Sequence, residues 1–267
     1  MNNVSGGQHR YCKLSLAVAV LALASPLWAQ TSPVTAMDDR WHFAVAPYAW
    51  FAGVSGTFGP FEAPVEASFS DIVKNLDIAV LGHLEARRNR VGVVVDINYL
   101  NLSANVPTEA PILGQLDLTA DMQSFMGEGV FFYRAVTGRD NAAFLDLLGG
   151  VRVTDTSTTL TVTGPQGGSL TGSEQKLGWV DGLVGIRFRV PLGSPRFGLE
   201  GRADVAGFGS DITWNLLGGL DVSVGKHWAL GAGYRHMHVD YDEGRGLDRK
   251  VFKEAFHGPG LWAAYSW

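Results

Sequence analysis

The sequence predicts an all-β transmembrane fold, an antiparallel up-and-down barrel, and three observations support this. The chain breaks into segments of alternating polarity, its connections alternate between short and long, and it ends in a strand-like run closed by Trp267. In that run Trp267, Tyr265, Ala263 and Leu261 share one apolar face. An unpaired apolar edge strand invites aggregation in a soluble protein. Pairing it with the first strand of a barrel removes the edge, and lipid accommodates the apolar face.

The first 29 residues have the pattern of a secretory signal peptide. Arg10 and Lys13 precede a short apolar run, and the small residue Ala29 provides a cleavage position. The run is too short for a membrane-spanning helix, which needs about 20 apolar residues. Cys12 precedes the run, so the mature chain would contain no cysteine. We therefore expect a signal peptide at 1–29, a short periplasmic tail at 30–40 and an outer-membrane barrel at 41–267.

The composition excludes two classes of protein. Without Arg10 and Lys13 the chain holds 19 basic and 26 acidic residues, and this balance argues against nucleic acid as a partner. No run after the signal peptide approaches 18 consecutive apolar residues, which excludes a helical membrane protein. We also expect no cofactor, because no phosphate-binding glycine loop, zinc signature or hydrolase elbow occurs.

Ten segments reach the roughly 9–11 residues that a tilted strand needs to cross a bilayer. They are Trp41–Gly56, Asp77–Arg88, Arg90–Leu102, Leu118–Arg134, Ala143–Thr163, Lys176–Val190, Arg196–Gly207, Ile212–Val224, His227–Tyr241 and Val251–Trp267. Eight strands are the alternative, if two of these segments form a ribbon outside the membrane.

The connections between these segments alternate in length. The short ones lie at 88–90, 136–141, 192–195 and 225–226. The longer ones lie at 57–76, 103–115, 164–175 and 242–250, and residues 70–76 are expected to form one helical turn. The connection at 208–211 is short although it falls on the long side. Short periplasmic turns and long outer loops are typical of an outer-membrane barrel with both termini in the periplasm.

The alternation assigns one face of each strand to lipid and the other to the lumen. A charge on the lipid face at mid-depth costs about 2–4 kcal/mol, so the charged face belongs to the lumen. The predicted lumenal charge ladder contains both signs and comprises Glu85, Asp96, Glu128, Arg134, Asp146, Arg152, Asp181, Arg187, Arg189, Glu200, Arg202, Asp204, Asp221 and Arg235. Because side chains fill most of a barrel this narrow, we expect a salt-bridged plug in preference to an open channel.

Aromatic residues fall near the ends of the segments, where amphipathic rings favour the membrane–water interface. The expected interface aromatics are Trp41, Phe51, Tyr99, Tyr133, Trp214 and Trp228. Tyr265 and Trp267 are expected to be the signal that the barrel-assembly machinery reads. The expected partners are therefore this machinery and the outer-membrane lipids.

His236, His238 and Asp240 share one face near the outer end of the ninth segment. This spacing can hold a metal or support acid–base chemistry. No fourth ligand or nucleophile accompanies it in the sequence. We therefore expect neither a metal nor a catalytic site, with these three residues as weak metal candidates.

Four stretches carry a recognisable pattern, namely 47–50 (PYAW), 68–72 (SFSDI), 204–214 (DVAGFGSDITW) and 233–235 (GYR), together with the aromatic C-terminus. On these motifs the chain resembles a group of largely uncharacterised proteobacterial outer-membrane β-barrel proteins. It departs from the group at Ala206, where a glycine is expected, and at His236, where an aromatic residue is expected. The resemblance implies the fold and the membrane, and it implies no reaction.

The expected function is that of a small envelope barrel, either structural or a narrow conduit for solutes. One alternative is a surface hydrolase of the omptin kind, with His238 and Asp240 facing Asp155 or Asp211 across the mouth. The other alternative is an adhesin or binding barrel that acts through extracellular loops at 57–76 and 103–115.

Overall fold

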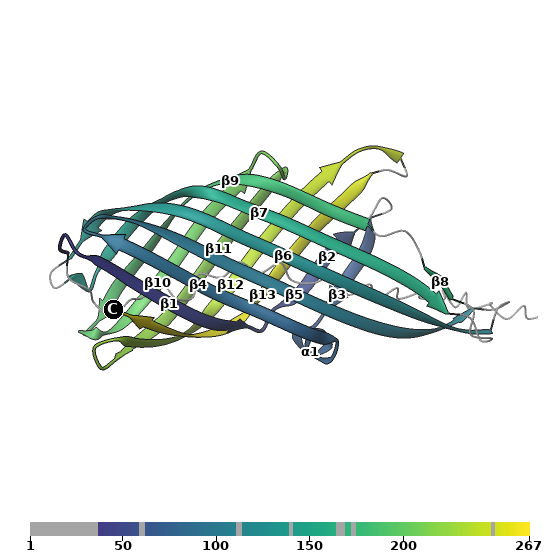
Figure 1. The fold of residues 1–267 in the computed structure, drawn as a ribbon, viewed down its shortest axis with the longest axis horizontal. Helices are drawn as coiled ribbons and strands as arrows, with labels where there is room; N and C mark the ends of the chain where they lie inside the picture. Colours follow the sequence, from purple (N-terminus) through teal and green to yellow (C-terminus); the bar gives the residue numbers. More distant parts are fainter. Residues whose placement is uncertain are drawn as a thin grey trace, which may run out of the picture.

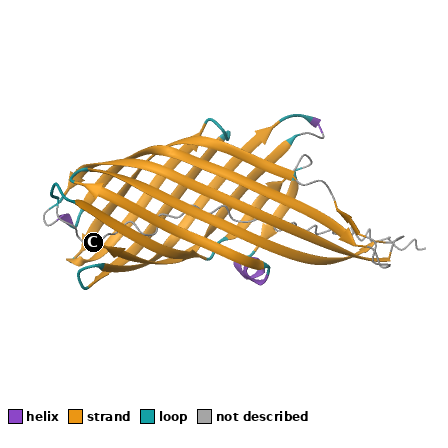
Figure 2. Ribbon diagram, viewed as in Figure 1, coloured by secondary structure: helices purple, strands orange, loops and turns teal. Residues whose placement is uncertain are grey.

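The computed structural model describes residues 37–58, 62–110, 114–138, 141–163, 169–171, 175–246 and 249–267. These residues form a closed antiparallel barrel of ten long strands, with three short strands and one helix at one end (Figures 1 and 2). The long strands follow one another around the barrel in chain order, and the last pairs with the first. The predicted ten-stranded up-and-down barrel is confirmed. The expected signal peptide and residues 30–36 of the expected tail lie outside the described residues.

The barrel strands are β1 (Trp41–Trp50), β4 (Leu76–Arg88), β5 (Val91–Ala110), β6 (Gly114–Thr137), β7 (Phe144–Thr163), β9 (Gln175–Leu192), β10 (Ser194–Gly207), β11 (Ile212–Val224), β12 (Trp228–Glu243) and β13 (Lys250–Ser266). The additional elements are β2 (Gly53–Phe58), β3 (Ala63–Ala67), α1 (Phe69–Lys74) and β8 (Ser169–Thr171). Among the described residues no helix is both long and apolar enough to span a membrane.

The two ends of the barrel differ in construction. The terminal end carries Trp41, Trp267 and tight turns, in which Gly193 and Gly225 adopt positive φ angles of 73° and 68°. The loop end carries the β2–β3 hairpin, α1, β8 and the projecting tips of β5 and β6 (Figure 1). This difference matches the predicted alternation of short and long connections.

The barrel closes at the terminal end through Phe43 and Trp267. Each residue donates its backbone N–H to the carbonyl of the other at 3.0 Å. The aromatic rings continue this closure, because Trp267 stacks on Phe43 at 5.8 Å and on Tyr265 at 5.9 Å between centroids. Trp228 packs against Tyr265 at 5.0 Å, which extends the aromatic row to β12.

Two parts of the chain are built differently from the prediction. The first segment, expected as one strand to Gly56, divides into β1 and β2, and β3 folds back on β2. The stretch at 103–115, expected as a loop, mostly continues β5 and β6, whose pairing runs to Ala110↔Gly114. The hydrogen bonds between β5 and β6 pair the backbone N–H and C=O groups of this hairpin. The hairpin therefore needs no membrane around it. The expected helical turn near 70–76 is confirmed by α1, which starts with a capping box at Ser68.

The two faces of each strand carry different side chains. On β7 the exterior face presents Leu147, Val151 and Val153, which are 49%, 49% and 38% exposed. The alternate positions Asp146 and Arg152 are 0% and 1% exposed in the interior. Side chains alternate with a period of two, so every second residue lies on the same face. Both charged side chains of β7 before Thr154, Asp146 and Arg152, therefore point into the interior.

The ladder between β1 and β4 stops part of the way up the barrel. Its last pair is Pro47↔Gly82, and proline has no N–H with which to continue. Beyond this pair, Tyr48 to Trp50 remain paired with β13, while Leu76 to Leu81 remain paired with β5. The short helix α1 lies at this break in the wall (Figure 1).

Candidate functional site

The lumen contains all fourteen residues of the predicted charge ladder. Each of them is at most 7% exposed, although they come from eight different strands. Burial this complete means that the described charged groups pack against one another and against their neighbours in the lumen. The polar lumen is therefore a packed interior.

A first ion-pair cluster lies toward the terminal end. Arg134 donates from Nε and Nη2 to the two carboxylate oxygens of Asp146 at 2.8 and 3.1 Å. Arg187 donates to the same carboxylate at 2.9 Å and to Glu85 at 2.8 Å. This chain of charges joins β4, β6, β7 and β9 across the lumen, so it crosses the barrel as well as following its wall.

Aromatic rings complete the surroundings of these arginines. The guanidinium of Arg134 lies 4.0 Å from the centroid of Phe144, and that of Arg187 lies 4.1 Å from the centroid of Phe132. A planar guanidinium stacks on a ring while it pairs bidentately, which an ammonium cannot do. This geometry favours arginine over lysine at both positions.

A second cluster forms a closed ring of charges at mid-height. Arg152 donates to Glu128 at 2.8 Å and to Asp204 at 2.7 Å. Arg202 donates to Glu128 at 3.1 Å and forms an ion pair with Asp204 at 2.6 Å. Asn215 donates to Oδ2 of Asp204 at 2.8 Å, the same oxygen that pairs with Arg202. Two acids and two bases thus neutralise each other in the centre of the barrel.

The polar network ends against two aromatic residues of β1. Arg235 donates to Asn215 at 2.5 Å and lies 4.9 Å from the centroid of Trp50. Tyr48 donates to Asn98 at 2.6 Å. Asp96 pairs with His83 at 3.3 Å. Tyr48 and Trp50 therefore mark the upper boundary of the network of paired charges.

Two further members of the ladder hold connections in place. Arg189 pairs with both carboxylate oxygens of Asp221 at 3.0 and 2.8 Å and donates to the carbonyl of Ala142 at 2.8 Å. Asp181 accepts from the backbone of Gly209 at 3.0 Å and of Ser210 at 2.7 Å. These hydrogen bonds hold the short connection at 208–211 against Asp181.

Glu200 is the exception within the ladder. It is 0% exposed, and neither of its carboxylate oxygens has a hydrogen-bond partner among the described residues. Glu254 on β13 shows the same combination. A buried carboxyl without a partner is costly in its charged form, so these two positions differ chemically from the paired acids.

Apart from the buried Glu254, the loop half of the lumen is largely apolar, and sequence reasoning missed this. Its interior side chains are almost fully buried and form one cluster, which includes Leu100, Met122, Met126, Trp179, Met237, Tyr241, Phe252 and Phe256. Trp179 stacks on Tyr241 at 4.6 Å between centroids. The signal was available in the sequence, because the interior parity that carries Glu128 continues on β6 to Met126 and Met122.

His236, His238 and Asp240 lie on the exterior face of β12. Their neighbours on β12, Arg235 and Met237, are 0% exposed inside the barrel. The ring of His236 stacks on Trp214 at 4.9 Å and on His257 at 5.8 Å. Nowhere in the described ranges do three or more His, Cys, Asp or Glu side chains converge as a metal site would require.

This placement corrects the residues assigned to the hydrolase alternative. Asp155 has the exterior parity of β7 and is exposed, as is Asp211 in the connection before β11. Because His238 and Asp240 also point outward, the proposed pairs cannot face each other across the mouth. Arg235 fixes the interior face of β12, and the period of two then places His236, His238 and Asp240 on the outside up to the outer rim.

The expected interface aromatics lie outside the lumen. Trp41, Tyr133 and Trp228 are 53%, 45% and 49% exposed near the terminal end. Tyr99 and Trp214 are half-buried on the exterior of β5 and β11. Phe51 packs edge-on against Phe69 of α1, at 4.9 Å between ring centroids. Of the expected signal residues, Trp267 is 56% exposed and Tyr265 is half-buried, both on the exterior.

The loop end also carries a charged cluster outside the wall of the barrel. Arg249 donates to Asp242 at 2.8 Å and pairs with Glu62 at 2.8 Å. The hydrogen bond from Arg249 lowers the pKa of Asp242 from 3.8 to about 2. Lys253 pairs with the same carboxylate at 3.2 Å. These pairs fasten the connection between β12 and β13.

Comparison with known proteins finds likeness in structure alone. No family model matches the chain, and no curated protein matches its sequence. The translocator domain of autotransporter NalP from Neisseria meningitidis is 15% identical over 84% of this chain and 88% of its own, with a TM-score of 0.42. A Pseudomonas aeruginosa FadL homologue is 10% identical over 90% and 93%, with a TM-score of 0.36. Ail of Yersinia pestis is 9% identical over 85% and 98%, with a TM-score of 0.34.

Proposed function

We propose that the chain is an integral outer-membrane barrel whose lumen is closed to solutes along its axis. A belt of apolar side chains on the exterior of the barrel supports its placement in a membrane. On β7 the exterior positions from Leu145 to Val153 are uncharged, and the first charge is Asp155. At about 3.3 Å per residue and a tilt of about 40°, the rise from Leu145 to this first charge at Asp155 is about 25 Å, the height of a lipid-facing band.

The same belt continues around the barrel. Val93, Phe131, Val184, Leu220 and Leu261 are exterior residues that are 46–61% exposed. An exposed apolar surface of this extent marks an interaction with lipid or protein. Because it encircles a closed barrel and is bordered by an aromatic row at the terminal end, lipid is the partner that fits.

The ion-pair clusters support the closed lumen. Two clusters span the interior, one around Asp146 and one around Glu128, and their side chains are almost completely buried. Removing one partner would leave a charge buried without compensation, so the clusters resist opening. A structural role in the envelope therefore fits better than axial conduction of solutes.

Reconstitution tests both parts of the proposal. The refolded protein should insert into phospholipid vesicles and migrate differently on gels before and after heating. In planar bilayers it should give no resolved conductance at moderate voltage, while an open outer-membrane porin recorded in parallel gives clear steps. Reproducible single-channel steps from the refolded protein would refute the closed lumen.

We also propose that Trp267 acts in assembly, as a residue read by the barrel-assembly machinery. Its backbone pairing with Phe43 at 3.0 Å supports this, because Trp267 takes part in the closing seam. Deleting Trp267 should lower the amount of protein in the outer membrane. Unchanged amounts of the deletion variant would rule out this role.

A further inference from the structure

The break in the ladder between β1 and β4 leaves an opening in the barrel wall. From Trp41 to Pro47, six residues along β1, the wall is closed by pairing with β4. At about 3.3 Å per residue and a tilt of about 40°, the opening begins about 15 Å above the terminal rim. It therefore begins within the apolar band, and it extends toward the loop end.

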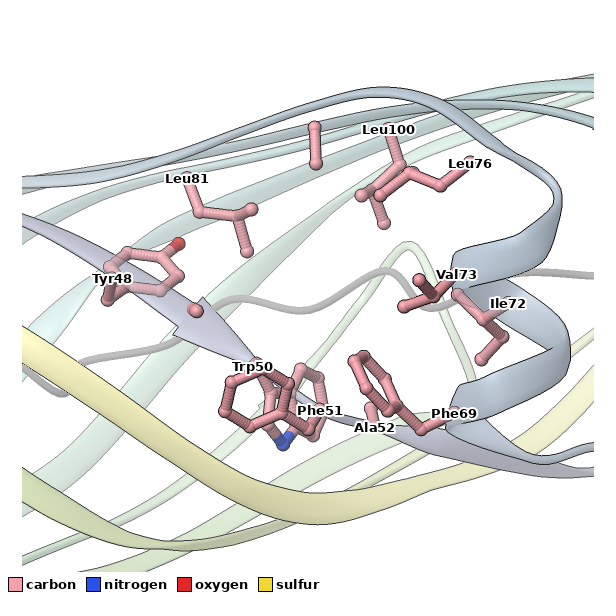
Figure 3. Close-up of a pocket in the computed structure, with 12 residues that line it drawn as sticks. Tyr48, Trp50, Phe51, Ala52, Phe69, Ile72, Val73, Leu76, Leu81 and Leu100 are labelled. Atoms are coloured by element: carbon pink, nitrogen blue, oxygen red, sulfur yellow. The ribbon is translucent and has the colours of Figure 1, made fainter.

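A cavity of about 350 Å³ occupies this opening (Figure 3). Its walls come from three parts of the chain. Tyr48 and Trp50 of β1 lie on one side, Leu81 and Leu100 of β4 and β5 lie opposite them, and Ile72, Val73 and Phe69 of α1 close one end. We call this cavity the wall pocket.

The wall pocket crosses the barrel wall. Its lining includes Tyr48 and Trp50, which point into the lumen, and Ala49 and Phe51, which have the exterior parity. Ala79 of β4 has the interior parity and is nevertheless exposed. Next to it, Ile78 and Val80 are 48% and 53% exposed on the lipid side. An apolar molecule in the bilayer can thus reach the pocket without entering water.

The polar atoms of the lining side chains are already engaged. The hydroxyl of Tyr48 donates to Asn98 at 2.6 Å, and Nε1 of Trp50 donates to the carbonyl of Gly258 at 3.1 Å. The other lining side chains are aliphatic or phenyl groups. The pocket has no free polar side chain with which to select a polar ligand, so its ligand has to be a hydrocarbon.

The volume limits the ligand to a single chain. An apolar cavity of about 150 Å³ holds one benzene molecule, so the wall pocket has room for about 14 carbon atoms. A two-chain lipid would have to divide its chains across the rim formed by β1 and α1. A single-chain amphiphile inserts its tail and leaves its head group at the interface.

We propose that the wall pocket binds the hydrocarbon tail of a single-chain amphiphile, such as a long-chain fatty acid. The inference rests on the membrane placement proposed above, and it is independent of axial conduction. Binding buries the tail against Trp50 and Leu100 while the ion-pair clusters below stay closed. The barrel is then a receptor for apolar chains that enter through its wall.

Fluorescence quenching by bromine provides the test, because bromine quenches a tryptophan only at contact and Trp50 lines the pocket. The full protein is reconstituted in vesicles of unbrominated phosphatidylcholine and titrated with dibromostearic acid. A saturable component of quenching is expected, and it should be absent from the Trp50→Phe variant. Failure to insert into the vesicles would be seen before any ligand is added, and it would contradict the membrane placement rather than the pocket.

Two filling variants and one matched control locate the binding. Ala79→Phe fills the pocket from β4, and Val73→Phe fills it from α1, where Val73 is 47% exposed and tolerates replacement. Ala232→Phe adds the same volume at an exposed exterior position on β12. Each buried methylene contributes about fourfold to affinity, so the filling variants should bind at least about tenfold more weakly. The control should match the wild type.

Three outcomes would overturn the proposal. Quenching that never saturates would mean that the fatty acid contacts only the exterior tryptophans. Equal quenching in the wild type and both filling variants would place the site elsewhere. If vesicles of brominated phosphatidylcholine quench Trp50 and free fatty acid does not, the pocket is a contact for bilayer lipid and the single-chain assignment is wrong.

Discussion

The terminal half and the loop half of the lumen are closed by different means. In the terminal half, arginines and carboxylates from many strands neutralise each other, as around Glu128 and Asp146. In the loop half, methionine and aromatic side chains such as Met126 and Phe252 fill the interior. Directional ion pairs require an unbroken wall to hold their partners in position. Apolar packing has no such requirement, and the wall opens where the apolar half begins, at Tyr48.

Breaking the central ring should have the largest effect of the changes considered. Arg152→Met removes the base that bonds both Glu128 and Asp204, and two buried acids lose a partner. Removing one partner of a buried pair costs about 3–5 kcal/mol. The free energy of unfolding in urea should fall by that amount, while Arg88→Met at the exposed end of β4 should change it by less than about 0.5 kcal/mol. Equal effects of the two variants would show that the ring does not stabilise the barrel.

Tight packing of the terminal half predicts an intermediate effect at Gly231. A Cβ atom at Gly231 would overlap the indole of Trp262, which is 4% exposed in the lumen. Overpacking of this kind costs about 1–3 kcal/mol. The control is Gly218→Ala, where a Cβ atom would meet nothing within 4 Å. Thermal unfolding of both variants measures the difference, and a neutral Gly231→Ala would mean that Trp262 can move aside.

The smallest effect concerns pH and the exterior pair of Asp242 and Arg249. Arg249 lowers the pKa of Asp242 to about 2 in the folded protein, against 3.8 without a partner. A lowered folded pKa gives stability that is present above the unfolded pKa and is lost as the pH falls toward the folded pKa. The difference in stability between the wild type and Asp242→Asn should therefore be constant from neutral pH to about 5, and it should shrink between about 4 and 2. A difference that changes near neutral pH instead would assign the effect to another group.

The barrel was predictable from the sequence because its physical signal repeats on every strand. Alternation such as Val91, Val93 and Val95 against Asp96 fixes the faces, and each strand supplies the same information independently. The interior position of the charge ladder follows from the same period. Its full pairing does not, because Arg152 bonds Glu128 on the neighbouring strand β6 and also reaches past β9 to Asp204 on β10.

The wall pocket could not be predicted, because it depends on a missing interaction. Pro47 ends the pairing with β4, yet a proline at this position is also compatible with a simple strand end. The first segment was expected to run unbroken to Gly56, so the division into β1 and β2 was missed. Only the register of β1 against both neighbours shows that the wall is open at Tyr48 and Trp50.

Single-cysteine labelling tests the difference between the two halves most directly. In a Cys12→Ser background, Ala79→Cys places a thiol in the wall pocket and Val130→Cys places one in the terminal half, where Val130 is 3% exposed. In reconstituted vesicles, a lipid-soluble maleimide should label Ala79→Cys and leave Val130→Cys unmodified until the protein is denatured. Labelling of folded Val130→Cys by a membrane-impermeant maleimide would show that water reaches the charged half, and it would contradict the closed lumen.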